Sequence, residues 1–224
     1  MPFHFADGMT FNTRGDADAR VVDEVVISKT YEKPKLGFRV LPHELWLDLG
    51  ANIGAFSVWA SKKRKAQIVA IEPIKENVKL LHQNIQLNNA NVEVIHAAVG
   101  VNNGTLQMKY NAKTPARSST LAAEGESVIV PMLSLNELIA QYKPAGLKID
   151  IEGGELDILD AGIDLTGIRA IALEYHFRFD KNMHSARRRI AALDKHFPKQ
   201  SVQRCIYSFD RWVAWQDTTM FFWM

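Results

Sequence analysis

The 224-residue chain contains a single cysteine, Cys205, and so cannot form an intramolecular disulfide bond. An α/β domain of this length buries enough surface to fold without such a cross-link. We therefore expect a reducing environment, in which Cys205 serves as a small buried hydrophobe.

Long apolar runs are also missing, although hydrophobic residues make up 47% of the chain. No stretch approaches the roughly 18 apolar residues that a membrane-spanning helix needs. Residues 1–7 lack the basic region and following apolar region of a signal peptide. These absences predict a soluble, cytoplasmic protein with no membrane span.

The chain has no strong excess of charge of one sign, since its formal net charge is +2. This balance argues against a nucleic-acid partner. Two basic clusters stand out, at residues 62–65 and 187–189. We interpret the first as the charged end of a helix and the second as a solvated helix face. The alternative is a footprint for nucleic-acid phosphates.

The most informative segment is a glycine turn between a strand and a helix. Residues 48–54 read Asp-Leu-Gly-Ala-Asn-Ile-Gly, after the apolar run 45–47 and before the helical pattern 55–60. Such a turn brings the backbone close to a ligand at the carboxyl end of a parallel strand. Asn52 replaces the second glycine of the dinucleotide pattern, and no phosphate-loop Gly-Lys-Ser/Thr follows. S-adenosylmethionine is then the remaining common cofactor for this unit.

Strands and helices alternate over the first half, which predicts a parallel sheet with right-handed crossovers. We expect buried strands at residues 45–48, 67–72, 91–95, 146–151 and 169–175, and helices at 75–88, 134–142 and 155–161. Further strands are expected at 105–110, 127–132, 203–209, 212–215 and 218–223, the last ones forming an antiparallel edge. Ser134 and Glu137 have the spacing of a helix capping box.

Two segments are expected to face the substrate. Residues 1–43 would form an N-terminal lid or substrate-side segment, with a helix at 16–28 over the site, and residues 44–224 the main domain. The long connection at 111–126, rich in small and polar residues, would lie near the ligand.

The acidic residues at two strand ends fit the proposed cofactor. A carboxylate accepts two hydrogen bonds at once, so Glu72 can hold the ribose 2′ and 3′ hydroxyls, as an acid at the corresponding place does in dinucleotide folds. Asp48 supplies a second anionic group, and Asn52 lies in the turn between Gly50 and Gly54. These five residues belong to the predicted cofactor-binding set.

The ordered motifs resemble those of the FkbM family of class I methyltransferases. They are the turn at residues 48–57, Ile-Glu-Pro at 71–73, Ala-Ala-Val-Gly at 97–100 and Lys-Ile-Asp-Ile-Glu-Gly-Gly-Glu at 148–155. The resemblance implies a Rossmann-like α/β fold: a seven-stranded, mostly parallel sheet with an antiparallel C-terminal strand and helices on both faces. It also implies S-adenosylmethionine, a cofactor contact at Ala98, and methylation of a hydroxyl on a sugar or natural product.

The predicted catalytic residues follow two neighbouring strands: Asp150 and Glu152, then Glu174 and His176. One of them would act as general base toward the acceptor hydroxyl. A Mg²⁺ or Mn²⁺ ion held by Asp150, Glu174 and His176 is the less favoured alternative. We interpret Glu155 as an acid that complements a helix dipole.

The Asn-Pro-Pro-Tyr motif of enzymes that methylate nucleobase amino groups is absent, which favours oxygen as the methylated atom. The predicted acceptor is therefore a small molecule or a glycan, with deoxyhexoses such as rhamnose or fucose as examples. A nucleic-acid methyltransferase and a catalytically silent binding module are the competing hypotheses.

Overall fold

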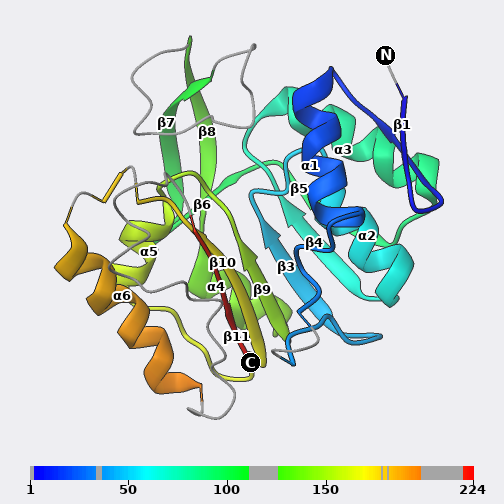
Figure 1. Ribbon diagram of the computed structural model, residues 1–224. Coiled ribbons are helices and arrows are strands. Elements are labelled where there is room, and N and C mark those ends of the chain that lie inside the picture. The colour runs from blue at the N-terminus through cyan, green and yellow to red at the C-terminus, as the bar shows by residue number, and fades with distance from the viewer. Residues whose placement is uncertain (1–2, 34–36, 111–125, 178, 181, 198–218) are drawn as a thin grey trace.

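A computed structural model describes residues 3–33, 37–110, 126–177, 179–180, 182–197 and 219–224 (Figure 1). Cys205, the predicted strands at 203–209 and 212–215, and nearly all of the connection 111–126 lie outside these ranges. None of the helices in the described ranges is both long enough and apolar enough to cross a bilayer.

The centre of the molecule is a six-stranded sheet. Its strands are, in spatial order, β11 (Thr219–Trp223), β10 (Ala170–Tyr175), β9 (Gly146–Ile149), β3 (Leu45–Leu49), β4 (Gln67–Ile71) and β5 (Val92–Ile95). All neighbours pair in parallel except β11, which runs antiparallel to β10. The predicted parallel sheet with an antiparallel C-terminal strand is confirmed. The described residues supply six of the seven predicted strands.

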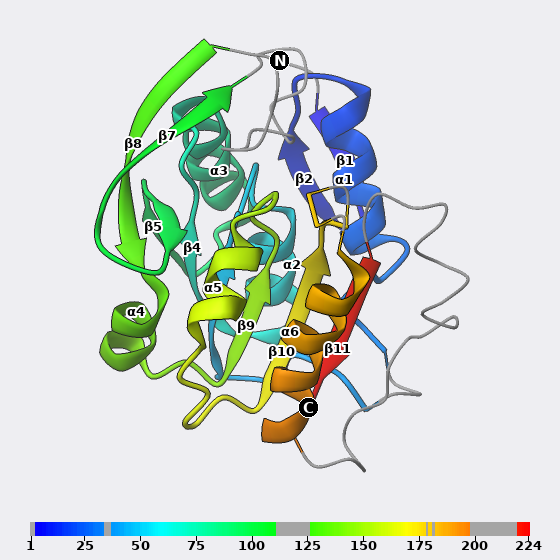
Figure 2. The same ribbon diagram turned by 90° about the vertical axis from the view of Figure 1, so that its left-hand side faces the viewer.

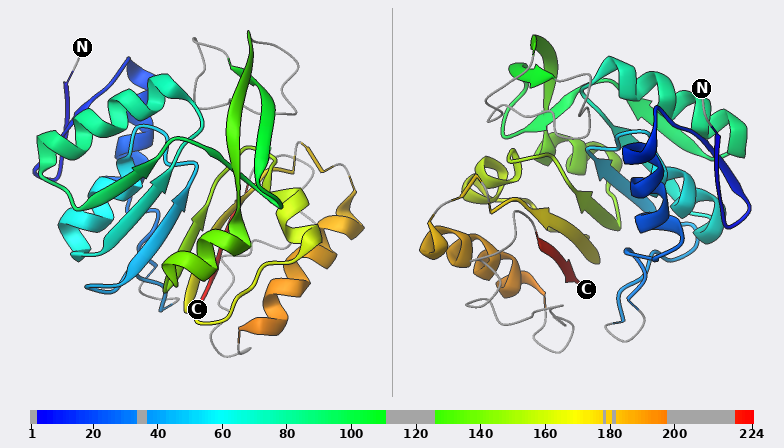
Figure 3. Two further views of the ribbon diagram at one scale, coloured as in Figure 1. Left: turned by 180° about the vertical axis from the view of Figure 1, so that it is seen from behind. Right: turned by 45° about the horizontal axis from the view of Figure 1, so that its top comes forward.

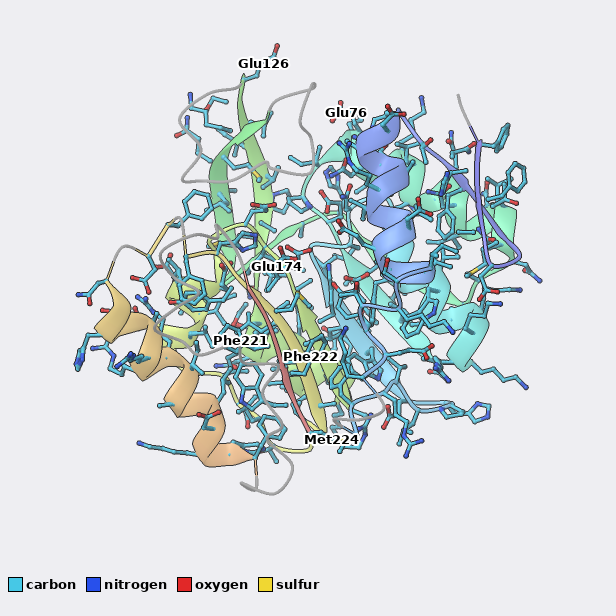
Figure 4. All side chains as sticks on the ribbon, in the orientation of Figure 1. Glu76, Glu126, Glu174, Phe221, Phe222 and Met224 are labelled. Atoms are coloured by element: carbon cyan, nitrogen blue, oxygen red, sulfur yellow. The ribbon has the colours of Figure 1, made fainter. Side chains whose placement is uncertain are left out.

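Helices cover both faces of this sheet, as predicted. On one side lie α1 (Asp16–Val26), α2 (Ala55–Arg64) and α3 (Lys75–Asn88), and on the other α4 (Leu135–Tyr142), α5 (Glu155–Ala161) and α6 (Met183–His196) (Figures 1 and 2). Successive strand residues point to opposite faces. Phe221 therefore packs in the core under α5 and α6, and Phe222 in the core under α1 and α2 (Figure 4).

Two small sheets lie beside the central one. The N-terminal hairpin of β1 (Phe3–Ala6) and β2 (Met9–Asn12) packs on the side of α1 and α3 (Figure 3). The strands β6 (Ala98–Gly100), β7 (Gly104–Tyr110) and β8 (Glu126–Ser134) form a second sheet. The predicted strands at 105–110 and 127–132 are thus confirmed, but they pair with each other outside the central sheet.

The start of α4 differs from the predicted capping box. Ser134 is the N-cap residue, but its side chain makes no capping bond. Instead, Asn103 accepts a hydrogen bond from the Ser134 amide at 2.8 Å and donates one to Glu137 at 2.7 Å. The β6–β7 turn supplies the cap from a distance of 31 residues along the chain, which local spacing cannot reveal.

The carboxyl ends of β3, β4, β9 and β10 all reach one edge of the sheet. From β3 the chain proceeds to β4 and β5 on one side, and later to β9 and β10 on the other. Open α/β sheets bind ligands at such a reversal of strand order. The fold therefore places the candidate site at the boundary of β3 and β9.

Candidate active site

Two cavities open at this edge of the sheet. The β4 cavity encloses about 700 Å³ including its mouth, and its walls come from the ends of β3 and β4, from β6 and β7, and from the turn after β9. The α1 cavity encloses about 880 Å³ including its mouth, between α1, Tyr31, the β3–α2 turn, the ends of β9 and β10, and Met220. Four residues line both cavities: Gly50, Asn52, Asp150 and Glu152.

Gly50 allows the β3–α2 turn to touch the end of β9. Its φ of +78° lies in the left-handed region, and a Cβ there would sit 1.8 Å from the carbonyl oxygen of Asp150. The Gly50 and Ala51 amides both donate to the Ile71 carbonyl at 3.0 Å. The turn is therefore fixed between β4 and β9, at the junction of the two cavities.

Gly54 and Ala98, both predicted cofactor contacts, lie at different places. Gly54 begins α2 with φ +88°, and a Cβ there would approach the Leu81 side chain to 2.4 Å. It does not line either of the two cavities, whereas Ala98 lines the β4 cavity. The contribution of Gly54 is to let α2 start close to α3.

Glu72 is buried at the β4 cavity and already has several partners. Its Oε2 accepts from the Asn52 amide at 2.8 Å, and its Oε1 accepts from the Ile74 amide at 3.0 Å and from the Asn77 side chain at 2.9 Å. Burial raises the pKa of this carboxyl, and these bonds oppose that rise. Because a carboxylate offers about four acceptor positions, Glu72 keeps capacity for about one further hydrogen bond. The predicted grip on both ribose hydroxyls exceeds this capacity.

Asn52 adopts a left-handed conformation with φ +52°, which asparagine tolerates better than most residues. Its side-chain oxygen is buried and finds no hydrogen-bond partner among the described residues. A buried acceptor without a partner costs about 1–3 kcal/mol. A bound ligand with a donor group at the cavity junction would remove that cost.

Asp48 lies beneath the turn and lines neither cavity. It is fully buried, its Oδ2 accepts from Ser57 Oγ at 2.6 Å, and its Oδ1 lies 3.1 Å from Lys148 Nζ. Lys148 also donates to the Gly50 carbonyl at 2.8 Å and approaches Asp150 at 3.4 Å. Burial lowers the pKa of Lys148, but the charges of Asp48 and Asp150 outweigh it and raise the pKa overall. Lys148 therefore remains a cation that links the turn to Asp150.

The four predicted catalytic residues come together. Asp150, Glu174 and His176 each place one potential ligand atom within 4.8 Å of the other two. His176 Nε2 lies 3.4 Å from Glu152, 3.9 Å from Asp150 and 4.0 Å from Glu174. Figure 4 shows Glu174 in the middle of the molecule, between the two groups of helices. The three carboxylates line the α1 cavity, whereas His176, 1% exposed, lies behind them.

Glu155 is the buried partner of His176. One carboxylate oxygen accepts from both the amide and Nδ1 of His176 at 2.9 Å, and the other accepts from the Gly153 amide at 2.8 Å. Glu155 lies in the first turn of α5, as predicted, but its 0% exposed carboxylate also binds His176, which the sequence did not predict. The family motif was the only sequence signal that set Glu155 apart.

The charges of this cluster shift two pKa values. Repulsion from Asp150 and burial raise the pKa of Glu174 to about 7, against the opposing charges of His176 and Lys148. Burial disfavours protonated His176, but its hydrogen bond to Glu155 and the charges of Glu155, Glu152 and Asp150 prevail and raise its pKa to about 9. At neutral pH His176 is a cation, and Glu174 is close to half protonated.

Sequence reasoning missed three residues of this region. Lys148 is one, although it stands two positions before Asp150, and side chains two positions apart along a strand point to the same side. Asn77 orients Glu72, and Tyr31 lines the α1 cavity from the N-terminal segment. No local pattern around Asn77 or Tyr31 indicates a site.

The sheet order, the antiparallel edge strand and the cavities at the strand ends define a Rossmann-like class I methyltransferase fold. The family model described as "Methyltransferase FkbM domain" matches residues 48–212, and the chain belongs to this methyltransferase family. The resemblance found in the sequence is confirmed.

Individual proteins are more distant. The chain is 28% identical to "Methyltransferase sdnD" of Sordaria araneosa, a match that covers 53% of this chain and 60% of that protein. The solved structures that are similar at low identity include two that cover most of this chain. One is TYW2 of M. jannaschii in complex with AdoMet, with 14% identity and a TM-score of 0.47, covering 98% of this chain and 82% of that one. The other is precorrin-6y C5,15-methyltransferase of Geobacter metallireducens GS-15, with 19% identity and a TM-score of 0.43, covering 83% of this chain and 76% of that one.

Proposed function

We propose that the protein is an S-adenosylmethionine-dependent O-methyltransferase that acts on a hydroxyl of a sugar in a glycan or of a natural product. The meeting of the two cavities at Gly50, Asn52, Asp150 and Glu152 carries this proposal. A group-transfer enzyme must hold two substrates with their reacting atoms in line. The β4 cavity would take the methyl donor and the α1 cavity the acceptor.

The β4 cavity suits the methyl donor. Apolar side chains of Ile74, Leu106 and Met108 line it and can cover a purine. Glu72 can accept one ribose hydroxyl, and the unpartnered oxygen of Asn52 can accept from another donor group. When bound, S-adenosylmethionine supplies an electrophilic methyl group. Asp48 would act indirectly, by holding Lys148 and the turn in place.

Glu174 is the proposed general base. It lines the α1 cavity, and a carboxylate oxygen lies within 4.8 Å of one of Asp150 at the junction. A base is most effective when its pKa is close to the working pH, and the pKa of Glu174 is about 7. Asp150 and Glu152 would orient the hydroxyl at the junction. His176 would act through these carboxylates as a positioning residue.

A divalent cation is the second way to activate the hydroxyl. The convergence of Asp150, Glu174 and His176 within 4.8 Å supports this alternative, because carboxylates and one histidine suit Mn²⁺ or Mg²⁺. Exhaustive chelation separates the two mechanisms. Unchanged turnover after chelation would support direct base catalysis. Loss of turnover that Mn²⁺ restores would support activation of the hydroxyl by a divalent cation instead.

A nucleic-acid acceptor is less consistent with the basic clusters. Lys63 pairs with Asp7 and Arg64 with Glu32, so these two cations fasten the N-terminal segment to α2. Arg188 and Arg189 both pair with Asp160. Cations that already have carboxylate partners gain less from phosphates. A nucleic-acid substrate would also make activity fall steeply with salt.

The N-terminal segment is proposed as the acceptor side of the enzyme. Val21, Glu24 and Val25 of α1, followed by Thr30 and Tyr31, line the α1 cavity. The predicted helix over the site is present as α1. On this proposal the N-terminal segment, predicted at residues 1–43, would add a wall to the methyltransferase domain predicted at 44–224.

The test is a screen of sugar acceptors with methyl-labelled S-adenosylmethionine, followed by NMR to locate the transferred methyl group. We expect an O-methyl product, and we expect Glu174→Gln to abolish it while S-adenosylhomocysteine still binds. Binding of S-adenosylhomocysteine is measured by calorimetry on the same preparations. A wild-type protein that fails to bind it would indicate a silent methyltransferase fold.

A further inference from the structure

Tyr31 is a buried phenol that the proposed chemistry does not use. It is 5% exposed, and its ring packs edge-on against Phe56 with centroids 4.8 Å apart at 67°. It lines the α1 cavity together with Lys148, Asp150 and Glu174. Among the residues that the structure describes, none forms a hydrogen bond with its hydroxyl.

A purely structural role does not account for the hydroxyl group. Phenylalanine would fill the same space beside Phe56, and the hydroxyl adds a polar group at the cavity wall for which the described residues provide no partner. Burial together with the carboxylates of Asp150 and Glu174 keeps the pKa of Tyr31 raised, although Lys148 opposes them. The phenol therefore keeps its proton at any ordinary pH and can donate a hydrogen bond to a ligand atom in the cavity.

The charges around the cavity restrict what that atom can belong to. Asp150, Glu152 and Glu174 line the cavity, and both nearby cations already have carboxylate partners. Lys148 is held by Asp48, Asp150 and the Gly50 carbonyl, and His176, which does not line the cavity, is held by Glu155. Like charges a few ångströms apart repel each other appreciably near a protein surface. A phosphate or carboxylate on the acceptor would meet this repulsion, whereas hydroxyl groups can donate to the same carboxylates.

We propose that Tyr31 is a specificity-determining residue of the acceptor site, where it donates a hydrogen bond to an oxygen of a polyhydroxylated ring that carries no phosphate or carboxylate. This inference rests on the proposed assignment of the α1 cavity to the acceptor. The apolar side chains of Val21, Val25 and Phe56 would cover one face of the ring. The carboxylates at the strand ends would bind its hydroxyl edge.

The test compares wild type with Tyr31→Phe and with Tyr142→Phe as the matched control. Tyr142 also bears a hydroxyl, which donates to Glu93 at 2.5 Å, and it lines neither cavity. The probes are methyl α-rhamnopyranoside and rhamnose 1-phosphate, and their binding is measured by ligand-observed NMR in saturating S-adenosylhomocysteine. Thermal unfolding of each variant verifies the fold.

We expect wild type and Tyr142→Phe to bind the neutral sugar equally and more tightly than the phosphate. Tyr31→Phe should lower the affinity for the neutral sugar about 3- to 10-fold, as expected for the loss of one hydrogen bond. The affinity for S-adenosylhomocysteine should not change. Glu174→Gln should improve binding of the phosphate, because it removes a negative charge.

Three results would overturn the inference. Tyr31→Phe could bind the neutral sugar like wild type, wild type could bind the phosphate more tightly than the neutral sugar, or wild type could bind neither sugar. Failure of the proposed function is a different outcome. It would appear as loss of S-adenosylhomocysteine binding in the wild-type protein itself.

Discussion

The pKa of Glu174 suits its proposed role as general base. Its value of about 7 comes first from the charge of Asp150, which disfavours a second negative charge beside it. We expect the logarithm of kcat/KM to rise with pH and level off above about pH 7, as Glu174 loses its proton. Glu174→Gln should reduce kcat by 10²- to 10⁴-fold and remove this pH dependence.

Neighbouring substitutions should move that pH dependence in opposite directions. Asp150→Asn removes the repulsion, lowers the pKa of Glu174 and shifts the rise to lower pH. His176→Gln removes a stabilising cation and shifts it to higher pH. A pH–rate profile measured on chelated enzyme checks both, and Glu93→Gln, away from both cavities, should match wild type. Shifts in the same direction would show that another group acts as the base.

Substitutions of Glu72 and Asp150 should affect different quantities, cofactor affinity in one case and turnover in the other. Glu72 organises the wall of the β4 cavity through Asn52, Ile74 and Asn77, so Glu72→Ala should weaken binding of S-adenosylhomocysteine at least 10-fold. Asp150→Ala should mainly reduce kcat, because Asp150 lies at the junction of the cavities. Calorimetry and steady-state kinetics measure the two effects. Equal affinity of wild type and Glu72→Ala would refute the role of Glu72.

At the scale of residues, the sequence predicts which side chains gather but not which of them are accessible. Asp150, Glu152, Glu174 and His176 follow adjacent parallel strands, and the fold brings them together. The position of His176 behind the carboxylates depends on Glu155, which binds it from α5. That contact joins residues 21 positions apart and has no local pattern.

At the scale of elements, α6 is fastened to β10 by a buried network. Asp180 accepts from Tyr175 and from Arg189, both at 2.5 Å, and Arg189 also pairs with Asp160. Arg189→Met would leave the buried Asp180 without its cation and should lower the free energy of unfolding by about 3–5 kcal/mol. Arg188→Met, at a side chain that is 66% exposed, should cost less than about 1 kcal/mol. Urea unfolding of the two variants compares them, and equal losses would contradict this account.

Sequence periodicity predicts whether a segment is a helix or a strand more readily than it predicts which other segment it contacts. Hydrophobic spacing predicts β4, α3 and β10, because each buries a face that recurs with the period of its own backbone. The pairing of β8 with β7 and β6 in a separate sheet joins residues far apart in the chain. The cap of α4 by Asn103 has the same origin.

At the scale of the whole molecule, His176 couples stability to pH. Its pKa is about 9 in the folded protein and 6.5 when unperturbed, so the folded state holds its proton more strongly. The resulting stabilisation is full below pH 6.5 and is lost as the pH rises through 9. It amounts to about 3 kcal/mol at most.

Urea unfolding of wild type and His176→Gln at pH 6.5 and at pH 9 tests this coupling. The variant should be less stable at both pH values because Glu155 loses its partner, and the gap should narrow at the higher pH. A gap that is constant over this range would mean that His176 is neutral in the folded protein.

The contact between Gly50 and the Asp150 carbonyl has a thermodynamic consequence. Because the two cavities share their central residues, a ligand in one cavity changes the free energy of the groups that face the other. Linkage is reciprocal: whatever factor the methyl donor applies to the affinity for the acceptor, the acceptor applies to the affinity for the donor. If the two cavities hold the two substrates as proposed, cooperativity between them would act through a turn that has room only for glycine.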